Sequence, residues 1–472
     1  MSLFEQASLD SAQESWSDIA PRSPRKATDA RFVPHYAGAH LVGGYLPQRA
    51  EPWLGPRARA HAESYAHAGQ VSIEDLDQYA SHKLWTWPGA HVVFVSDLHA
   101  DADAFCRSLV ASGAVEKTRA GDAQLRLTES GREATFVIGG DCFDKGPSSL
   151  RLLRMLQTLM ATGARVRILA GNHDLHALLG VSAAGESQPL LAHLFVRMGV
   201  KLVPLLRELV ESYRLDTAAT SSLAEENRLC RELFPQEAWY RDFPQAAGGL
   251  LSGKKIEHEL VRIREKTRAF EAACAKAKLS LAQVMLAIAK FKELFLTPGG
   301  EFHWYFSRME LAHRCGSVLF MHAGVDDQVA AQLHGAGVEA LNLDFRRLLT
   351  ERKLFELYHG PVGNVFRTKY RDGDFELSER GVQLLHGAGI HGLVHGHRNL
   401  RRGQRMILRN GMLNFECDAS VDCNTRAQQC LAGAGGAATV FSPDGVVMGI
   451  STDHPRVKVF DPAQHCRLMT LV

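Results

Sequence analysis

Five short apolar runs, each leading directly into a polar residue or a glycine, constrain the fold of this chain more than any other feature. The runs are rich in Val, Ile, Leu and Phe, which is typical of strands buried on both faces. They are HVVFVS (91–96), ATFVIG (134–139), RVRILA (165–170), SVLFMH (317–322) and IHGLVH (390–395). Because open α/β sheets bind ligands at the carboxyl ends of their strands, we expect a site where these runs end.

Helix-like stretches alternate with the first strands and then replace them. SLRLLRMLQTLMATG (149–163) follows a Gly-Pro-Ser turn and ends on a glycine, as a capped helix does. Residues 176–316 are rich in Ala, Leu, Glu, Lys and Arg at helical spacing, most clearly in 256–279 and 281–295. The sequence therefore predicts an α/β core interrupted by an inserted helical subdomain or cap.

The predicted division of the chain follows from its length and from these patterns. Dividing 472 residues by roughly 150 residues per domain suggests two or three domains, or one large domain with insertions. ATVFSPDGVVMGIST (438–452) predicts a hairpin around its Pro-Asp-Gly turn, within a β-rich stretch. The predicted segments are an irregular N-terminal lead-in (1–88), the first part of the core (89–175), the helical insertion (176–316), and the second part of the core with a C-terminal β-rich segment (317–472). We expect the first residues of the lead-in, about 30 of them, to be disordered.

Composition and charge exclude several classes of protein. Lys and Arg number 54 and Asp and Glu 52, so the formal net charge of +2 offers no global attraction to nucleic acid or to an anionic membrane. Nine cysteines are thinly spread without a C-x-x-C, which argues against a disulfide framework and a zinc finger. The start of the chain has no basic segment followed by an apolar one, and no uncharged apolar run reaches about 18 residues. We therefore expect a soluble protein of the reducing cytoplasm, without a nucleic-acid partner or membrane association.

Clusters of Asp, His and Asn follow the apolar runs. The clusters are Asp97-Leu98-His99, Asp141-Cys142-Phe143-Asp144-Lys145, Asn172-His173-Asp174, His322, and His395-Gly396-His397. Each cluster alone is more typical of a turn or a helix cap, but the same position at five strand ends indicates one shared site. Hard carboxylate oxygens and borderline imidazole nitrogens suit Mn²⁺, Fe and Zn²⁺. A pair of such ions about 3.5–4 Å apart can hold a bridging hydroxide and clamp the oxygens of an in-line phosphoryl displacement.

The ordered set DxH, GDxxDxG, GNHD, HAG and GH resembles the calcineurin-like metallophosphoesterase superfamily. It is similar in particular to the PPP branch, which contains serine/threonine phosphatases and diadenosine tetraphosphatases. The resemblance covers 91–175 and 317–420, and leaves the lead-in and the helical insertion outside it. It implies a four-layer α/β/β/α sandwich with metals at the strand ends, here carrying a helical insertion.

The resemblance also implies a role for each matching residue. Asp97 and His99 would bind the first metal, Asp141 would bridge, and Asn172, His322 and His397 would complete the second metal site. His173 would be the general acid that protonates the leaving group, with Asp144 orienting and charging its imidazole. Chemistry alone supports this last pair, because a leaving alkoxide needs a proton and a His beside a carboxylate can supply one.

Two positions in the first motifs depart from the family pattern. Lys145 stands where the PPP branch usually has Arg, so it is expected either to contact phosphate as a point charge or to be a solvated surface residue. Asp101 adds a carboxylate near the predicted metals, either as a tuner of the ligands or as the N-cap of a helix over 102–111. We favour the cap.

The last motif allows two registers. Phosphodiesterase-like branches have GHxH, whereas here Arg398 follows the GH and His395 supplies an HxH out of frame. We place His397 on the metal and interpret His395 as a histidine at the end of a buried strand. Arg398 is expected to meet a phosphate oxygen or to face solvent.

Two further positions are expected near the substrate. The PPP branch uses a second phosphate-binding Arg before its last motif, and Arg367 lies in that interval, with Arg371 as the alternative. Asp418 lies after the GH motif, where we expect it to support the metal ligands from behind, with Asp422 nearby.

These features favour a metal-dependent phosphomonoesterase of serine/threonine protein phosphatase type, acting on a phosphorylated small molecule or protein. The missing second histidine of GHxH favours it over the alternative, a nucleotide hydrolase for dinucleoside polyphosphates or cyclic nucleotides. A third alternative is a non-catalytic scaffold that binds partners through the helical insertion. We expect two metal ions, Mn²⁺ first, with Fe or Zn²⁺ as alternatives. Because the insertion enters after GNHD and leaves before His322, it is placed to restrict which esters enter.

Overall fold

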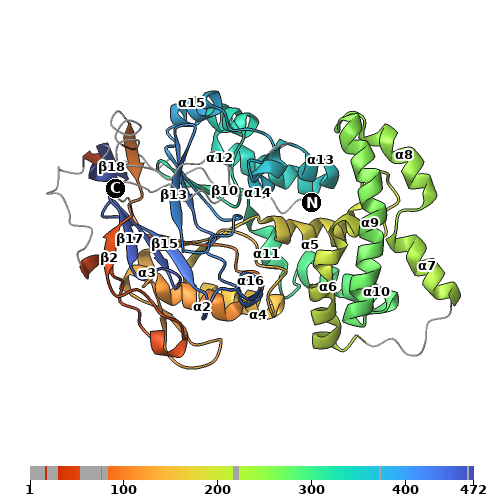
Figure 1. Ribbon diagram of the computed structural model, residues 1–472, viewed down its shortest axis with the longest axis horizontal. Coiled ribbons are helices and arrows are strands. Elements are labelled where there is room, and N and C mark those ends of the chain that lie inside the picture. Colours follow the sequence, from red (N-terminus) through yellow and green to blue (C-terminus); the bar gives the residue numbers. More distant parts are fainter. Residues whose placement is uncertain are drawn as a thin grey trace.

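Two β-sheets packed face to face, with helices on both outer sides, form the core of the protein (Figure 1). The computed structural model describes residues 16–18, 30–53, 76, 83–215, 223–371, 374–464 and 467–471. The first residues, for which we expected disorder, lie almost wholly outside this described part. The two sheets and two helix layers confirm the predicted four-layer α/β/β/α sandwich.

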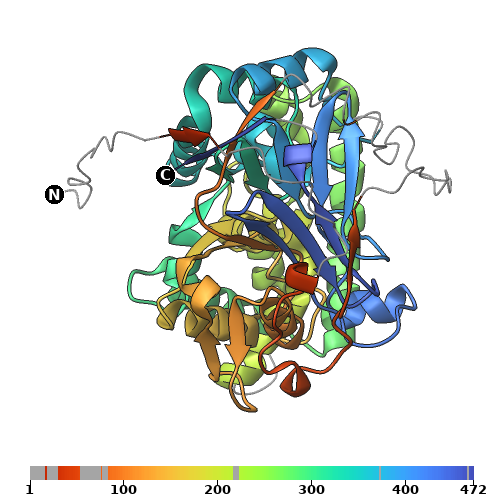
Figure 2. The ribbon, with the colours of Figure 1, turned by 90° about the vertical axis from the view of Figure 1, so that its left-hand side faces the viewer.

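The larger sheet has the strand order β2-β17-β16-β15-β4-β7-β8-β9. Its strands are β2 (Ala50–Pro52), β4 (Val92–Val95), β7 (Thr135–Ile138), β8 (Arg165–Leu169), β9 (Met309–Glu310), β15 (Ala437–Ser442), β16 (Val446–Ser451) and β17 (Val457–Phe460). The central strands β4, β7 and β8 run parallel, so their carboxyl ends meet at one edge. β15 and β16 pair antiparallel, which confirms the predicted hairpin. Figure 2 views the molecule from the end where these C-terminal strands (blue) lie.

The smaller sheet has the order β10-β11-β12-β14-β13. Its strands are β10 (Ala312–Cys315), β11 (Val318–Met321), β12 (Gly392–His395), β13 (Arg405–Arg409) and β14 (Met412–Glu416). β11, β12 and β14 are parallel to one another. Each of the five apolar runs of the sequence therefore contains a strand, and each of these strands belongs to one of the two parallel groups.

Alternating side chains of the central strands pack into two different cores. In β4, Val92 and Phe94 pack between the sheets, whereas Val93 and Val95 pack against the outer helices. In β11, Phe320 meets Phe94 across the sheets, with ring centroids 5.9 Å apart. Because both faces are covered, these strands are continuous apolar runs rather than alternating ones.

Helices cover the outer face of each sheet. Figure 1 shows α2 and α4 below the larger sheet and α12 and α15 above the smaller one. The covering and connecting helices are α2 (Ala102–Ala111), α3 (Glu129–Glu133), α4 (Ser149–Ala161), α12 (Asp327–Thr350), α13 (Leu354–His359), α14 (Asn364–Arg367), α15 (Glu379–Gly387) and α16 (Cys423–Gln428). Asp101 caps α2 by accepting a hydrogen bond from Ala104 N, and this confirms the predicted N-cap.

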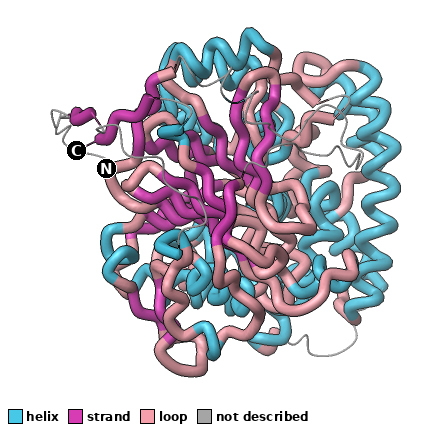
Figure 3. Tube along the Cα trace, turned by 60° about the vertical axis from the view of Figure 1, so that its left-hand side comes forward, coloured by secondary structure: helices cyan, strands magenta, loops and turns pink. Residues whose placement is uncertain are grey.

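A group of helices extends from the middle of Figure 1, beside the sheets, to its right-hand side. It comprises α5 (Asn172–Ala183), α6 (Leu194–Tyr213), α7 (Leu223–Leu233), α8 (Glu237–Ala247), α9 (Gly253–Ala277), α10 (Leu281–Phe291), the π turn η3 (Lys292–Leu296) and α11 (His303–Ser307). In Figure 3 these helices (cyan) stand beside the strands (magenta). The helices expected over 256–279 and 281–295 are present; the domain boundaries themselves stay a prediction.

Two small sheets and several short turns complete the described structure. The first sheet joins β1 (Trp16–Asp18), β18 (Arg467–Leu471) and β3 (Leu84–Trp87), and the second joins β5 (Val115–Lys117) and β6 (Leu125–Leu127). The 3-10 turns are η1 (Ala30–Phe32), η2 (Ala39–Leu41), η4 (Pro361–Gly363) and η5 (Pro462–Gln464). Within the described residues no single helix meets the length and hydropathy expected of a membrane span, although α9 with the segment 281–296 does so as a pair bent by 94°.

Candidate metal centre

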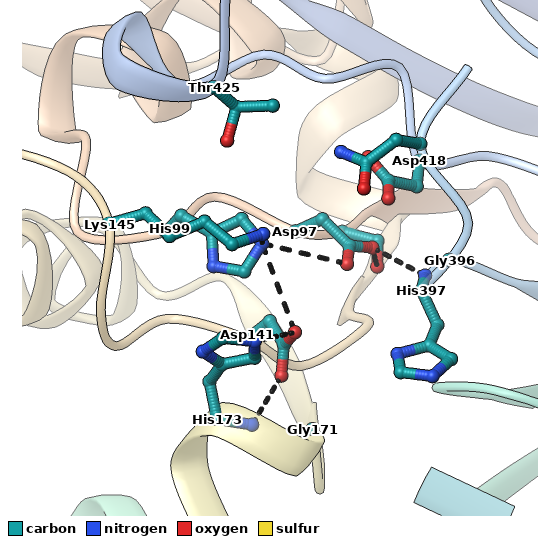
Figure 4. A network of polar contacts seen from close by, with 12 residues as sticks. Asp97, His99, Asp141, Lys145, Gly171, His173, Gly396, His397, Asp418 and Thr425 are labelled. Atoms are coloured by element: carbon teal, nitrogen blue, oxygen red, sulfur yellow. Dashed lines mark hydrogen bonds and ion pairs between the residues drawn. The ribbon is translucent and has the colours of Figure 1, made fainter. Parts of the chain in front are cut away.

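The loops that follow five strands meet in one buried pocket (Figure 4). Asp97 and His99 follow β4, Asp141 follows β7, and Asn172 and His173 open α5 directly after β8. His322 follows β11 and His397 follows β12. The six predicted ligands and His173 are all buried, so the structure brings the residues expected at the site together.

The backbone of these loops adopts a conformation that side chains seldom allow. Asp97, His99, Asp141 and His397 have positive φ, between 42° and 68°. Non-glycine residues in this left-handed region cluster at functional sites, where the surrounding structure must hold them in place. At Gly396 an added Cβ would lie 1.9 Å from Asp97 Oδ2, so only glycine allows the last motif to approach the first.

Asp141 lies at the centre of the pocket, with its two carboxylate oxygens facing different groups. Oδ2 lies 3.9 Å from His99 Nε2 and 3.8 Å from His173 Nε2. Oδ1 lies 3.5 Å from His322 Nε2 and accepts a hydrogen bond from the backbone N–H of His173. A carboxylate in this position can bridge two cations.

Three imidazoles are oriented in the way that metal-binding histidines usually are. His99 Nδ1 faces Phe143 O at 3.3 Å, His322 Nδ1 faces Gly139 O at 2.8 Å, and His397 Nε2 faces Arg367 O at 3.2 Å. A carbonyl oxygen only accepts hydrogen bonds, so each of these nitrogens carries the proton and the other nitrogen presents its lone pair. In each ring that other nitrogen points into the pocket, and His322 Nε2 lies 3.2 Å from His397 Nδ1 and 3.1 Å from Asn172 Oδ1.

Among the described residues two sets of three side chains have donor atoms close enough to hold an ion. One is His99, Asp141 and His173, and the other is Asp141, His322 and His397, with all atoms of a set within 4.8 Å of one another. Asp97 completes the first side, since its Oδ1 lies 4.0 Å from His99 Nε2 and its Oδ2 accepts from the backbone N–H of His397. Carboxylate, imidazole and amide donors of this kind fit Mn²⁺, Fe or Zn²⁺.

The charges in the pocket also fit a bound cation. Burial and the neighbouring charge of Asp141 raise the pKa of Asp97, and burial with the charge of Asp97 raises the pKa of Asp418 well above its usual value. Burial holds the pKa of His99 and His397 well below the usual value, so both rings are neutral at pH 7, as metal ligands must be. Burial opposes ionisation of Asp141, but the charges of His322 and His173 outweigh it and hold the pKa of Asp141 well below its usual value, so this carboxylate stays ionised. A buried carboxylate such as Asp97 is costly to ionise, and a cation between Asp97 and Asp141 would offset that cost.

His173 and Asp144 form a close pair at the rim of the site. Asp144 Oδ2 lies 2.8 Å from His173 Nδ1, so Nε2 is the ring nitrogen left facing the pocket. Burial opposes ionisation of Asp144, but the hydrogen bond and charge of His173 outweigh it and lower the pKa of Asp144. An imidazole paired in this way can hold a proton on Nε2 for a leaving group.

Asp174, whose role the sequence did not reveal, joins two of the metal-binding loops. Its side chain accepts hydrogen bonds from the backbone N–H groups of Asp141, Cys142 and Gly171. Burial, followed by the charge of Asp141, raises its pKa to about 7. Asp174 is the last residue of the GNHD motif. Its position in the first turn of a helix was the only sequence signal for this role.

The predicted phosphate-binding residues differ in where they lie. Lys145 lines the pocket with Nζ 2.7 Å from His99 Nε2, and Arg367 lines it with its guanidinium over the ring of Tyr358. Arg398 does not line it: its guanidinium binds Glu416 at 2.5 Å and Ala323 O at 3.1 Å. The two expectations for Arg398, a contact with phosphate and exposure to solvent, are therefore both wrong. β14 places the buried carboxylate of Glu416 beside Arg398, and the guanidinium binds that carboxylate instead.

The remaining alternatives are placed as follows. Arg371 does not line the pocket, whereas Asp418 does, and its Oδ1 accepts from Ser420 N. Asp422 caps α16 by accepting from Thr425 N. His395 turns its Nδ1 to Gly396 O and belongs to neither set of donor atoms, while burial lowers its pKa to about 3.

Pocket residues that no motif marked include Lys201, Lys369 and Tyr358. Lys201 comes from α6 of the helical group, and its Nζ lies 3.3 Å from His173 Nε2. Burial lowers the pKa of Lys201 and of Lys369. No sequence signal distinguished the two lysines from other charged residues, or Tyr358 from other aromatic residues, on helices and loops.

Comparison with known proteins gives matches to phosphoesterases. Residues 90–251 match the family described as calcineurin-like phosphoesterase. A symmetrical bis(5'-nucleosyl)-tetraphosphatase of Pectobacterium atrosepticum is 29% identical over 159 residues, which cover 29% of this chain and 53% of that protein. Its namesake in Baumannia cicadellinicola is 52% identical over 44 residues, covering 9% and 14%. The chain thus spans about half the length of the first of these relatives.

Solved structures of phosphatases show a weaker likeness. The cold-active protein-tyrosine phosphatase of a psychrophilic Shewanella species superposes with a TM-score of 0.42 at 14% identity, covering 87% of this chain and 91% of that one. A protein serine/threonine phosphatase from Saccharomyces cerevisiae gives a TM-score of 0.32 at 12% identity, covering 82% and 85%.

Proposed function

We propose that the chain is a calcineurin-like phosphoesterase, the family that residues 90–251 match, and that it hydrolyses phosphoric esters with the help of two bound metal ions. The observation that carries this proposal is the orientation of three imidazoles. His99, His322 and His397 each give one ring N–H to a backbone carbonyl and turn the other nitrogen toward Asp141. Histidines that only stabilise a fold would not be expected to direct three unprotonated ring nitrogens toward one carboxylate.

Six side chains would hold the ions. Asp97, His99 and Asp141 would bind one, and Asp141, Asn172, His322 and His397 would bind the other. Ions of this kind supply an activated water at neutral pH and neutralise charge on the phosphoryl group. We propose Mn²⁺ as the ion, with Fe or Zn²⁺ as alternatives that the same donor set accepts.

The acid of the reaction would be His173. As the oxygen of water bonds to phosphorus, the bond from phosphorus to the leaving oxygen breaks, and that oxygen takes the proton from His173 Nε2. Asp144 holds the ring through Nδ1 and so fixes Nε2 as the donor. Lys145 and Arg367 line the same pocket and would bind the phosphoryl oxygens.

Two classes of substrate are supported by different observations. The curated relatives carry the name bis(5'-nucleosyl)-tetraphosphatase, and the pocket is lined by four cationic side chains, Lys145, Lys201, Arg367 and Lys369. Both observations favour a nucleoside polyphosphate. The absence of a second histidine after His397 favours a phosphomonoester of protein phosphatase type. A non-catalytic scaffold is disfavoured, because an unused site would not be expected to keep the His173–Asp144 pair.

Hydrolysis assays of the metal-loaded protein test the proposal. The substrates are p-nitrophenyl phosphate, bis-p-nitrophenyl phosphate, a phosphopeptide and diadenosine tetraphosphate, and their kcat/KM values rank the substrate classes. His173→Ala should lower kcat by about 10²–10⁴-fold without changing the metal content. His258→Ala, which removes an exposed histidine from α9, is the matched control and should leave kcat unchanged. Hydrolysis of none of the four substrates would refute the function, and a normal kcat for His173→Ala would refute the acid.

The compartment is part of the proposal. The cysteines that the structure describes are all free, including the buried Cys106, Cys142 and Cys274. Free thiols in this number are typical of the reducing cytoplasm. We propose that location.

A further inference from the structure

Lys201 brings a positive charge from the helical group into the pocket of the metal centre. Its Nζ lies 3.3 Å from Nε2 of His173, and it lines the same pocket as Asp97 and Asp141. Among the described residues it forms no ion pair within 4 Å, and the charges of Asp144 and Asp141 only partly offset its burial, which lowers its pKa. A partly buried ammonium that no carboxylate contacts directly is costly, so its position indicates an anionic ligand.

Close helix packing holds Lys201 in this place. α5 starts at the site with Asn172, and α6 packs along α5. At Gly180 of α5 an added Cβ would lie 2.9 Å from Leu202 Cδ1 and 3.2 Å from Met198 Cβ, so this glycine allows the close approach of α6. Leu202 and Met198 flank Lys201 on α6, which means that the same contact fixes the lysine over His173.

The position of Lys201 relative to His173 identifies which part of a substrate it would meet. Because Nδ1 of His173 faces Asp144, the proton for the leaving group comes from Nε2. The leaving oxygen must then lie within about 3 Å of Nε2, and Lys201 Nζ is beside that same atom. Lys145, in contrast, lies 2.7 Å from His99 Nε2, on the metal side of the pocket.

A cation on the leaving-group side distinguishes between kinds of leaving group. A neutral alcohol offers an ammonium no counter-charge, whereas a phosphate directly beyond the scissile oxygen offers several charged oxygens. Cleavage would then give the hydroxyl of water to the transferred phosphorus and leave the bridging oxygen on the second phosphate.

We propose that Lys201 is a specificity-determining residue that binds a phosphate on the leaving-group side and so selects substrates in which the scissile oxygen joins two phosphates. This inference rests on the proposed hydrolysis of phosphoric esters. It assigns to the helical group a direct role in substrate choice.

The first test compares two substrates in three variants of Lys201 and in one control variant. Tripolyphosphate has a phosphate leaving group and p-nitrophenyl phosphate does not. Lys201→Met removes the charge, and Lys201→Gln removes it a second way. In both variants the kcat/KM for tripolyphosphate, divided by the kcat/KM for p-nitrophenyl phosphate, should fall by about 10- to 100-fold. Most of the fall should come from a higher KM for tripolyphosphate. Lys201→Arg should restore most of the ratio. Lys276→Met, which removes an exposed lysine from the last turn of α9, should leave the ratio unchanged.

The second test measures binding without turnover. Calorimetry with methylenediphosphonate, which cannot be hydrolysed, should show a Kd about tenfold or more weaker in Lys201→Met, with a smaller change for inorganic phosphate. Equal losses on both substrates and both ligands, or no loss on either, would overturn the role of Lys201. If the unmodified protein hydrolyses neither these two substrates nor any of the other three esters named for the proposed function, that function fails, while the binding comparison still decides whether Lys201 recognises the second phosphate.

Discussion

Replacing Glu416 by Gln should destabilise the protein by an amount that depends on pH. Glu416 is fully buried at the end of β14 and binds the guanidinium groups of Arg398 and Arg405. Burial alone would raise the pKa of Glu416, but the charges of Arg398, His395 and Arg405 outweigh it and lower the pKa to about 2.

The shift sets both the magnitude and the pH range of the effect. A drop from the usual 4.5 to about 2 corresponds to about 3 kcal/mol. Because the pKa is lowered in the folded state, this stabilisation is complete above about pH 5 and is lost as the pH falls toward 2. Glu416→Gln should therefore cost about 3 kcal/mol at pH 7 and only about half as much at pH 3.

Urea denaturation followed by tryptophan fluorescence at pH 7, 5, 4 and 3 measures this difference. Glu116→Gln is the matched control, since Glu116 pairs with the exposed Arg126, and surface pairs of this kind contribute less than about 1 kcal/mol. A cost for Glu416→Gln that stays constant from pH 7 to 3 would refute the argument. So would a cost no larger than that of the control.

Three further outcomes are expected. Asp144→Asn removes the charge that holds His173, so kcat should fall by about 10- to 100-fold while the metal content, measured by elemental analysis, stays the same; a fall in metal content instead would contradict the assignment. Asp101→Ala removes the cap of α2 and the acceptor of Cys423 N, and should lower the unfolding free energy by about 1 kcal/mol without lowering kcat/KM. Removing metal with a chelator should lower the melting temperature, because Asp97 and Asp141 then lack their counter-charge, and added Mn²⁺ should restore it; an unchanged melting temperature would speak against a metal centre.

The sequence predicted the fold and the meeting of the candidate ligands because both depend on local patterns. A continuous apolar run marks a strand covered on both faces, and Val92–Val95 shows how adjacent residues then serve two cores. A polar residue directly after such a run lies at the carboxyl end of its strand. Parallel pairing of β4, β7 and β8 brings these ends together, so Asp97, Asp141 and Asn172 meet without further information.

Arg398 shows why the same reasoning failed elsewhere. Its partner Glu416 follows eighteen positions later, in a strand that pairs parallel with β12 so that His395 lies opposite Glu416. Nothing local in the sequence reveals which strands are neighbours, and a basic residue after a metal-binding motif is therefore equally compatible with a substrate contact and an internal ion pair. The register between β12 and β14 determines that Arg398 forms the internal ion pair.

The helical group presents a harder case, and the argument about Lys201 follows from it. Helical spacing predicts which residues of α6 are apolar, but Lys201 lies between the partly buried Val200 and the buried Leu202 and has no motif of its own. Lys201 reaches the pocket only because α6 packs against α5, and α5 begins at the metal centre. The family motifs supply metal ligands and an acid that suit any phosphoester. A charged residue on an inserted helix, in contrast, can change from one protein to another without disturbing those ligands or the acid. Substrate choice is therefore expected to reside in the insertion, and the response of the substrate ratio to Lys201→Met tests that division of roles directly.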